Sequence, residues 1–170
     1  MLAVRRSVPE DLGTILGIYS SARKFMRENG NPDQWGDKNP PAELVAADVT
    51  EEGHGHVCCD TETGEILGVF WFGYPYDDPT YRKIYDGEWL NGKEYGVVHR
   101  IATAENARGK GVAKFCLSYA LGISGNLRID THRNNIPMQN LLASLGFSRC
   151  GTIYLLGGDE RIAFQKSVTE

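Results

Sequence analysis

The spacing of apolar residues predicts a short strand and two helices in the first third of the chain. The strand is expected at residues 2–6, and a capping-box pattern at Ser7 and Glu10 is expected to begin the first helix. This helix ends near Gly30, and its apolar face consists of Leu12, Ile15, Leu16, Tyr19, Ala22 and Met26. A proline-rich loop separates it from a second helix, which is expected at residues 41–52.

Runs of β-branched and aromatic residues, and one alternating stretch, predict the strands of a sheet. The strands at 56–60 and 65–74 are expected to form one hairpin, and the last two strands are expected to form a closing hairpin. The predicted strands after the first are residues 56–60, 65–74, 95–103, 127–132, 147–156 and 161–166. Between the second and third of these lies a connection of about twenty residues, which is long enough to suggest a functional role.

Two further helices are predicted in the second half of the chain. The first runs to about Ser124, and its core-facing stripe is Ala113, Cys116, Leu117, Ala120 and Leu121. The second begins near Asn135 and ends at Gly146, with a core face of Met138, Leu141, Leu142 and Leu145. The elements together predict a mixed α/β sheet with helices on both faces.

Length and composition narrow the class of protein. The chain has 170 residues, enough for one domain with a sizeable core, and its net charge of −4 argues against nucleic-acid binding. No apolar run is long enough for a membrane span, and the N-terminus lacks the apolar core of a signal peptide, so a cytoplasmic location is expected. The four cysteines and four histidines show no zinc-site spacing, and no metal is expected.

The segment Arg108-Gly109-Lys110-Gly111-Val112-Ala113 stands between a predicted strand and a predicted helix. Glycines let the backbone approach a ligand closely, and the first N–H groups of a helix favour an anion. Alone, the segment fits a plain loop before a helix equally well, and it matches neither the P-loop nor the dinucleotide fingerprint. The local chemistry suggests a phosphorylated ligand.

The wider context resembles the GNAT superfamily of acetyl-CoA-dependent N-acetyltransferases. Arg108, Gly111 and Ala113 match the family's pyrophosphate turn, Gln/Arg-x-x-Gly-x-Gly/Ala, and Asn135 and a Leu-Gly-Phe ending follow at the family's spacing. The resemblance covers nearly the whole chain. It implies one GNAT domain over residues 1–170, with a mostly antiparallel central sheet of six to seven strands whose parallel fourth and fifth strands splay apart.

The resemblance also implies which residues bind acetyl-CoA or coenzyme A as co-substrate. Asn135 would contact the cofactor arm, although it has a plain interpretation as a helix N-cap. Backbone groups at the distorted end of the strand at 95–103 would hold the arm and stabilise the oxyanion. The residues expected to bind the cofactor are Ile101, Ala102, Thr103, Arg108, Gly109, Lys110, Gly111, Val112, Ala113 and Asn135.

The acceptor is expected to be a primary amine of a small molecule or an N-terminus. Trp35, Tyr85 and Trp89 lie in irregular segments and would frame its pocket, although such aromatics can simply cover the core or pack on the sheet edge. A compact amine such as an amino acid is favoured over a protein tail, and acidic residues at 77–78, 86 and 88 leave a polyamine open. No nucleic-acid or membrane partner is expected, and a homodimer is left open.

His99 is the candidate general base, because imidazole titrates near neutral pH and this residue precedes the distorted part of the strand. A buried structural histidine is the alternative, and His132 and Glu94 are weaker candidates for the base. Leu142 stands where the family has its usual tyrosine acid. Either the thiolate leaves without a proton donor, or His132 or Tyr119 serves as the general acid. The second hypothesis for the function is a catalytically silent module that binds acyl-CoA.

Overall fold

The computed structural model describes residues 1–168 of the chain. Within them, seven strands form one sheet in the order β1-β2-β3-β4-β5-β7-β6. Neighbouring strands are antiparallel except β4 and β5, which are parallel. The strands are β1 Leu2–Arg6, β2 Gly55–Asp60, β3 Ile66–Gly73, β4 Gly96–Thr103, β5 Asn126–Thr131, β6 Ser148–Tyr154 and β7 Glu160–Ser167. The predicted mixed, mostly antiparallel sheet is confirmed.

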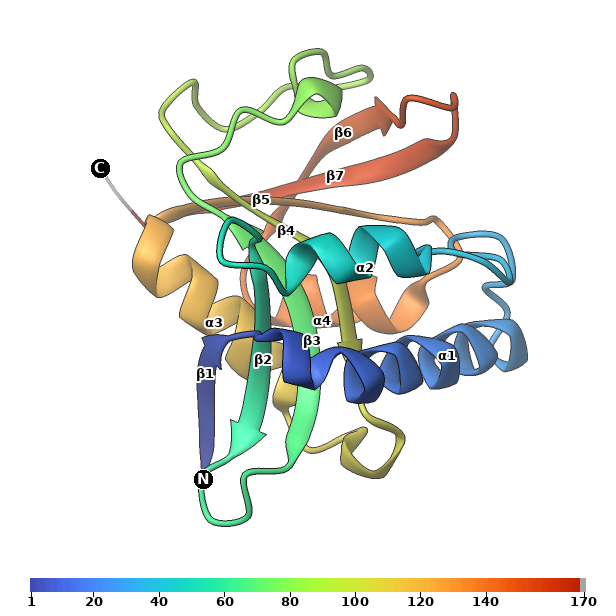
Figure 1. Cartoon of the computed structure of the whole chain (residues 1–170). Coiled ribbons are helices and arrows are strands. Elements are labelled where there is room, and N and C mark those ends of the chain that lie inside the picture. Colours follow the sequence, from blue (N-terminus) through green and yellow to red (C-terminus); the bar gives the residue numbers. More distant parts are fainter. Residues whose placement is uncertain (169–170) are drawn as a thin grey trace.

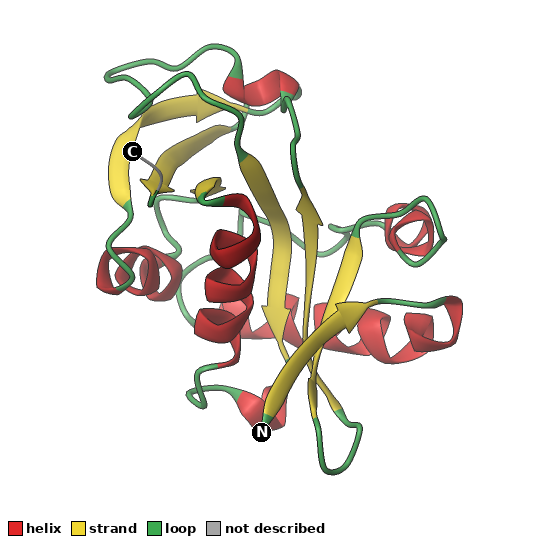
Figure 2. Cartoon of the chain, turned by 90° about the vertical axis from the view of Figure 1, so that its left-hand side faces the viewer, coloured by secondary structure: helices red, strands yellow, loops and turns green. Residues whose placement is uncertain are grey.

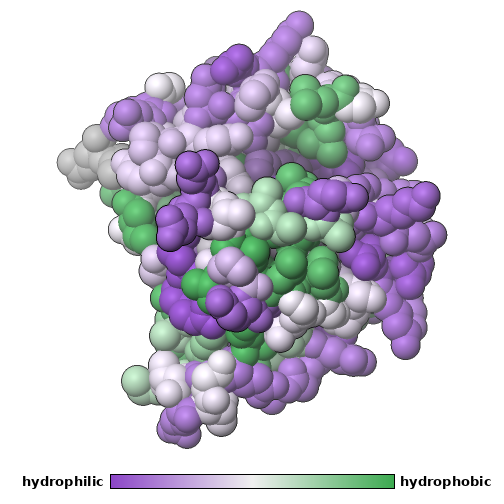
Figure 3. Space-filling view, viewed as in Figure 1, coloured by the Kyte–Doolittle hydropathy of each residue, from purple (hydrophilic) through white to green (hydrophobic). Residues whose placement is uncertain are grey.

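Four α-helices in the described part of the chain cover the two faces of this sheet. Helices α1 and α2 lie on one face and α3 and α4 on the other, which is clearest when the sheet is seen from its edge (Figure 1, Figure 2). On the side of α1 and α2, apolar side chains gather near the middle of the surface, and hydrophilic ones border them (Figure 3). The helices are α1 Leu12–Glu28, α2 Ala42–Asp48, α3 Val112–Ser124 and α4 Ile136–Ser144.

Strands β4 and β5 pair only at their beginnings. Gly96 lies opposite Leu127 and Val97 opposite Arg128, and the described ladder between the two strands ends there. The splayed parallel pair predicted from the sequence is therefore present. Backbone groups on this side of β4 beyond Val97 have no strand partner, so the gap offers hydrogen-bonding groups to a ligand.

The helix starts and ends differ from the predictions in two places. The capping box predicted at Ser7 and Glu10 is wrong: a 3₁₀ turn at Pro9–Asp11 precedes α1, and Asp11 Oδ2 accepts the N–H of Val8 at 2.9 Å. Because of the extra turn, the capping carboxylate belongs to Asp11 and not to Glu10. The helix predicted at 41–52 already ends at Asp48, because the N–H and hydroxyl of Thr50 both donate to the carbonyl of Ala47.

Two clusters of buried residues form the core. The larger includes the predicted stripe of α3, with Cys116, Leu117 and Ala120 each at most 1% exposed, and it contains the fully buried Leu142 of α4. Gly68 on β3 allows α3 to approach, because a Cβ there would meet Val112 Cγ1 at 2.6 Å. The absence of a Cβ at Gly68 therefore lets the start of α3 pack closely on the sheet, next to the parted strands.

The smaller cluster lies beneath the long connection between β3 and β4. Tyr81 is fully buried in it, and Trp89 packs against it and donates its indole N–H to the Tyr81 carbonyl at 2.9 Å. The guanidinium of Arg128 lies over the rings of Trp89 and Tyr95, 4.2 and 3.9 Å from their centroids. This connection is therefore built around a second core.

None of the helices in the described residues is long and apolar enough to cross a membrane. Across residues 1–168, no group of three or more histidine, cysteine, aspartate or glutamate side chains is placed to hold a metal ion. All four cysteines are free and buried, as expected of core residues.

Candidate functional site

The start of α3, directly after a glycine turn, presents backbone N–H groups that no helix carbonyl accepts. Gly109 and Gly111 have φ of +78° and +80°, a conformation that glycine adopts without strain. Phe115 N–H donates to the carbonyl of Gly111 at 3.0 Å, so the N–H groups of Val112, Ala113 and Lys114 precede the first bond of the helix. The geometry favours an anion at this point.

Open space lies in front of both glycines. A Cβ built on Gly109 or Gly111 would meet no atom within 4 Å, so positive φ, and not crowding by the protein, is what requires glycine here. The turn is held by Arg108, whose Nη2 donates to the Ser21 carbonyl of α1 at 3.1 Å and whose guanidinium lies 4.4 Å from the Phe25 ring centroid. The turn and α1 therefore form two sides of one opening.

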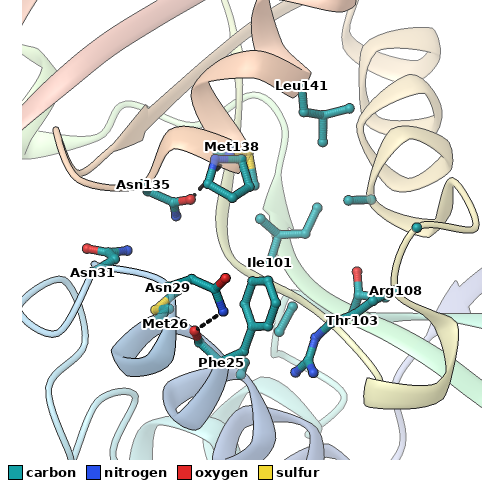
Figure 4. Close-up of a pocket in the computed structure, with 15 residues that line it drawn as sticks. Phe25, Met26, Asn29, Asn31, Ile101, Thr103, Arg108, Asn135, Met138 and Leu141 are labelled. Carbon is teal, nitrogen blue, oxygen red and sulfur yellow. Dashed lines mark hydrogen bonds between the residues drawn. The ribbon is translucent and has the colours of Figure 1, made fainter.

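A cavity of about 240 Å³ begins at this turn and runs between α1, β4 and α4. Figure 4 shows Phe25 and Met26 of α1 on one side, Ile101 and Thr103 of β4 on the floor and Met138 and Leu141 of α4 on the other side. Of the predicted cofactor residues, the cavity is lined by Ile101, Ala102, Thr103, Arg108, Gly109, Ala113 and Asn135. Residues chosen from two separate motifs thus meet along one groove.

A second cavity, of about 550 Å³, adjoins the first. Asn135, Ile101, Met26 and Met138 line both cavities, so the two share a wall. Asn135 caps α4 by accepting the Met138 N–H at 3.2 Å and also donates to Gln34 Oε1 at 2.9 Å. Asn135 is therefore both the N-cap of α4 and a residue at the junction of the two cavities.

Strand β4 bulges where the two cavities meet. Trp71 of β3 lies opposite His99 and Val69 opposite Ala102, so one residue of β3 faces two residues of β4, which are Arg100 and Ile101. Arg100 has φ of +51°, which is uncommon for a residue other than glycine. The bulge takes one of these backbone N–H groups out of the β3 ladder.

Two contacts hold this unusual backbone. The Arg100 carbonyl accepts the hydroxyl of Tyr19 at 2.7 Å, and the Arg100 guanidinium donates to both oxygens of Asp48 at 2.8 and 2.9 Å. The donors and acceptors come from α1 and α2 on one face of the sheet. The bulge is therefore fixed by the helices and is not a loose strand end.

His99 lies in the second cavity between two carboxylates. Its Nε2 lies 2.6 Å from Asp78 Oδ2, and its Nδ1 lies 3.9 Å from Asp130 Oδ2. Asp130 also accepts the hydroxyl of Tyr81 at 2.6 Å. All three of His99, Asp78 and Asp130 line the cavity, so the group can meet a ligand there.

The protonation states in this group follow from its contacts. Burial alone would raise the pKa of Asp78, but hydrogen bonds from His99 and Thr80 and the charge of His99 bring that pKa below its ordinary value. Burial and the nearby Asp130 raise the pKa of Tyr81 well above its ordinary value. At neutral pH, Asp78 is thus a carboxylate acceptor and Tyr81 remains a hydroxyl donor.

Of the aromatic residues predicted to frame an acceptor pocket, only Trp35 lines the second cavity. It packs edge-on against Tyr19, with ring centroids 5.6 Å apart. Trp89 belongs to the smaller core, and Tyr85 pairs with Thr152 of β6 and packs on Tyr154. The structure does not bring Tyr85 and Trp89 to either cavity among the described residues.

The other candidate acids and bases lie elsewhere. His132 lines a different cavity, its Nδ1 accepts the Asn134 N–H at 3.0 Å, and burial together with the charge of Arg161 lowers its pKa. Tyr119 of α3 packs against Phe70 and Phe72 of β3. Glu94 is exposed and lines neither cavity.

Several residues of the second cavity were missed by sequence reasoning. Asp130 and Arg100 could have been found, since they stand where the two parallel strands part and face the same gap. Asp78, in the long connection, was named only among the acidic residues that leave a polyamine open, and Arg161 on the last strand was not named, because no local pattern indicates what either residue faces. Fold topology alone brings both residues to the cavity that contains His99.

Comparison with known proteins shows the family. The family model for the acetyltransferase (GNAT) family matches residues 17–147, well over half of the chain. An acetyltransferase of the GNAT family from Streptococcus agalactiae is 27% identical and superimposes with a TM-score of 0.87 over 99% of this chain and 96% of that one. No curated protein sequence compared with this chain matches it significantly.

Two structures with acetyl-CoA share the fold. The YncA protein of Salmonella typhimurium, solved with its cofactor acetyl-CoA, is 16% identical with a TM-score of 0.65, over 99% of this chain and 95% of that one. A phosphinothricin acetyltransferase from Sinorhizobium meliloti in complex with acetyl-CoA is 19% identical, also with a TM-score of 0.65. The match covers 97% of this chain and 87% of that one. With its splayed strands, its glycine turn and this match over residues 17–147, the chain belongs to the GNAT acetyltransferase family.

Proposed function

We propose that this protein is an N-acetyltransferase that transfers an acetyl group from acetyl-CoA to the primary amine of a small molecule in a ternary complex. The observation that carries the proposal is the continuity of the two cavities. One begins at the free N–H groups before α3, the other contains His99, and they meet at Asn135 and the β4 bulge. A donor and an acceptor can therefore enter from different sides and meet at one point.

The residues of the first cavity fit coenzyme A. The N–H groups of Gly111, Val112 and Ala113 would hold the pyrophosphate, and a Cβ built on Gly111 would meet no atom within 4 Å, so the space beside this residue is open. The arm would run along the unpaired edge of β4 toward Asn135. Asn31 lines the same cavity, and its buried Oδ1 has no partner among the described residues, so it is available to an amide N–H of the arm.

His99 is well placed to take the proton of the amine. Because Asp78 accepts at Nε2, the neutral imidazole carries its proton on Nε2 and leaves Nδ1 free to act as the base. Asp130, 3.9 Å from Nδ1, would then stabilise the imidazolium and attract the ammonium of the incoming acceptor. Asp78 orients the ring, as the third member of a nucleophile–base–carboxylate group does.

Bond changes in the step balance around the thioester carbon. The amine nitrogen forms the new C–N bond, its proton passes to Nδ1, and the C–S bond breaks to release the thiolate. The backbone N–H of Ile101 at the bulge is our candidate for stabilising the oxyanion. A thiol has a pKa of about 8.5, so its thiolate is a stable leaving group. Neither His132 nor Tyr119 lines the second cavity, which fits departure of the thiolate without a proton donor.

The test of this function is release of free thiol from acetyl-CoA in the presence of a panel of small primary amines. We expect release that depends on the amine, together with mass gain of the amine by one acetyl group. The alternative, a silent acyl-CoA-binding module, predicts coenzyme A binding without amine-dependent release. That second result would overturn the proposed activity while leaving the binding groove in place.

Trp35 provides a prediction about the acceptor pocket. Trp35→Ala should raise KM for the amine about tenfold, roughly 1.4 kcal/mol, because the indole forms a wall of the second cavity. KM for acetyl-CoA should change much less, since Trp35 does not line the first cavity. Steady-state kinetics with both substrates varied measures the two constants separately.

Trp89→Ala is the matched control for Trp35→Ala. It removes another partly buried indole that packs against the core but lines neither cavity. An equal rise in the amine KM for both variants would mean that the effect comes from general loosening of the fold. A rise confined to the acetyl-CoA constant in Trp35→Ala would remove Trp35 from the acceptor pocket.

A further inference from the structure

Arg161 is a buried cation without a counter-ion. The residue is 6% exposed, and its guanidinium donates to two backbone carbonyls, those of Glu160 at 2.9 Å and Gln34 at 3.1 Å. Within the described part of the chain, no carboxylate oxygen lies within 4.0 Å of it. A buried charge that lacks an opposite charge is costly, which suggests that an anion from outside completes the site.

The register of the sheet places Arg161 near the amine end of the second cavity. Asp130 of β5 lies directly opposite Ala163 of β7, and Arg161 is two residues from Ala163 on the same face. Arg161 and Asp130 are thus diagonal neighbours, about 7–8 Å apart at the backbone. Both residues line the second cavity.

The remaining charges of this cavity are already paired or exposed. Asp78 is bound to His99, and Arg100 is bound to Asp48. Asp159 lines the cavity but is exposed, so water can solvate its charge. This leaves Asp130, which accepts the Tyr81 hydroxyl and lies 3.9 Å from His99 Nδ1, as the acidic group that faces the cavity without an arginine or lysine partner. Arg161 is the basic group that faces the cavity without a carboxylate partner.

A negative and a positive group on neighbouring strands of one cavity match a zwitterion. The ammonium of the ligand would lie at Asp130 and His99 Nδ1, and its carboxylate at Arg161, which can bind a carboxylate with two parallel hydrogen bonds. The other walls are largely apolar and suit an uncharged side chain; they include Trp35, Leu44, Ile129 and Leu155.

We propose that Arg161 binds the carboxylate of the acceptor and that the acceptor is an α-amino acid with an apolar side chain. The inference rests on the proposed function and adds the chemical class of the second substrate. It excludes simple amines and polyamines as preferred acceptors, since neither carries an anion for Arg161. It assigns to β7 a part in specificity that His99 and the β4 bulge do not supply.

The direct test compares L-methionine with L-methioninamide, which has the same shape but no carboxylate. We expect kcat/KM for the amino acid to exceed that for the amide by about 10²-fold. The amine of the amide loses its proton more readily, so without a carboxylate subsite the amide would react at least as fast. Calorimetric titration of both compounds into protein saturated with coenzyme A should give the same order of affinity without depending on turnover.

Arg161→Gln should reduce the preference for the amino acid over the amide to about one. Arg133→Gln is the matched control, because Arg133 is exposed and lines a neighbouring cavity that Arg161 also borders, so it should keep the preference. Loss of the preference in Arg133→Gln alone would place the carboxylate in that neighbouring cavity and overturn the proposal.

The comparison of the two compounds needs no variant, so a poorly folded Arg161→Gln would not prevent the test. An amide that is acetylated as fast as the amino acid by the wild-type protein overturns the subsite while the acetyltransferase function stands. Failure to acetylate any amine, with coenzyme A still bound, overturns the proposed function, and the subsite proposal with it.

Discussion

Replacing His99 by glutamine should lower kcat/KM for the amine by about 10²-fold or more at neutral pH. Glutamine can still donate a hydrogen bond to Asp78, which now accepts from Nε2 at 2.6 Å, but it cannot take up a proton from the amine. The affinity for acetyl-CoA should change little, because His99 lines the second cavity and not the first. Initial rates from pH 6 to pH 10 with calorimetric coenzyme A binding measure both effects.

The pH dependence separates a base from a structural residue. At pH values above the pKa of the free amine, the acceptor loses its proton to water, so the difference between wild-type protein and His99→Gln should shrink. The same replacement at His54, which is exposed and lines neither cavity, is the control and should leave the profile unchanged. A rate deficit in His99→Gln that is constant across this range would remove His99 as the base.

Gly111→Asp should weaken coenzyme A binding by about 10³-fold. At 4 Å from a phosphate charge, a carboxylate costs about 4 kcal/mol at the effective dielectric constant near a protein surface. The fold should persist, because a Cβ on Gly111 meets no protein atom within 4 Å and aspartate tolerates positive φ better than most residues. Calorimetric titration with coenzyme A gives the affinity, and thermal unfolding reports the fold.

Gly111→Asn is the matched control for this charge effect. It introduces the same backbone strain at φ of +80° and nearly the same shape, but no charge. We expect the two variants to unfold at similar temperatures and the asparagine variant to bind coenzyme A more tightly than the aspartate variant. Wild-type affinity in Gly111→Asp would show that the pyrophosphate does not lie at this turn.

Local patterns predicted those parts of the molecule that depend on neighbours in the chain. The apolar stripe of α3, the strand that feeds the glycine turn and the N-cap at Asn135 are set by residues a few positions apart, and each lies where it was expected. The parted strands came from the resemblance, since splaying is a property of two strands that are distant in the chain.

The rest of the site depends on contacts that spacing does not encode. His99 and Asp78 are 21 residues apart and Tyr81 and Asp130 are 49 apart, so only the folded sheet brings them together. An aromatic residue in an irregular segment has no period that shows which way it faces. Trp35 and Trp89 have the same local character, yet one lines a cavity and the other packs on a second core.

We propose that one continuous groove brings the thioester of acetyl-CoA next to His99. A crystal structure of the protein with acetyl-CoA tests it most directly. We expect the pyrophosphate at the N–H groups of Gly111, Val112 and Ala113, the arm beside Ile101 and Asn135, and the acetyl group in the second cavity. An acetyl group that lies outside the second cavity, or a pyrophosphate away from the turn before α3, would contradict the account.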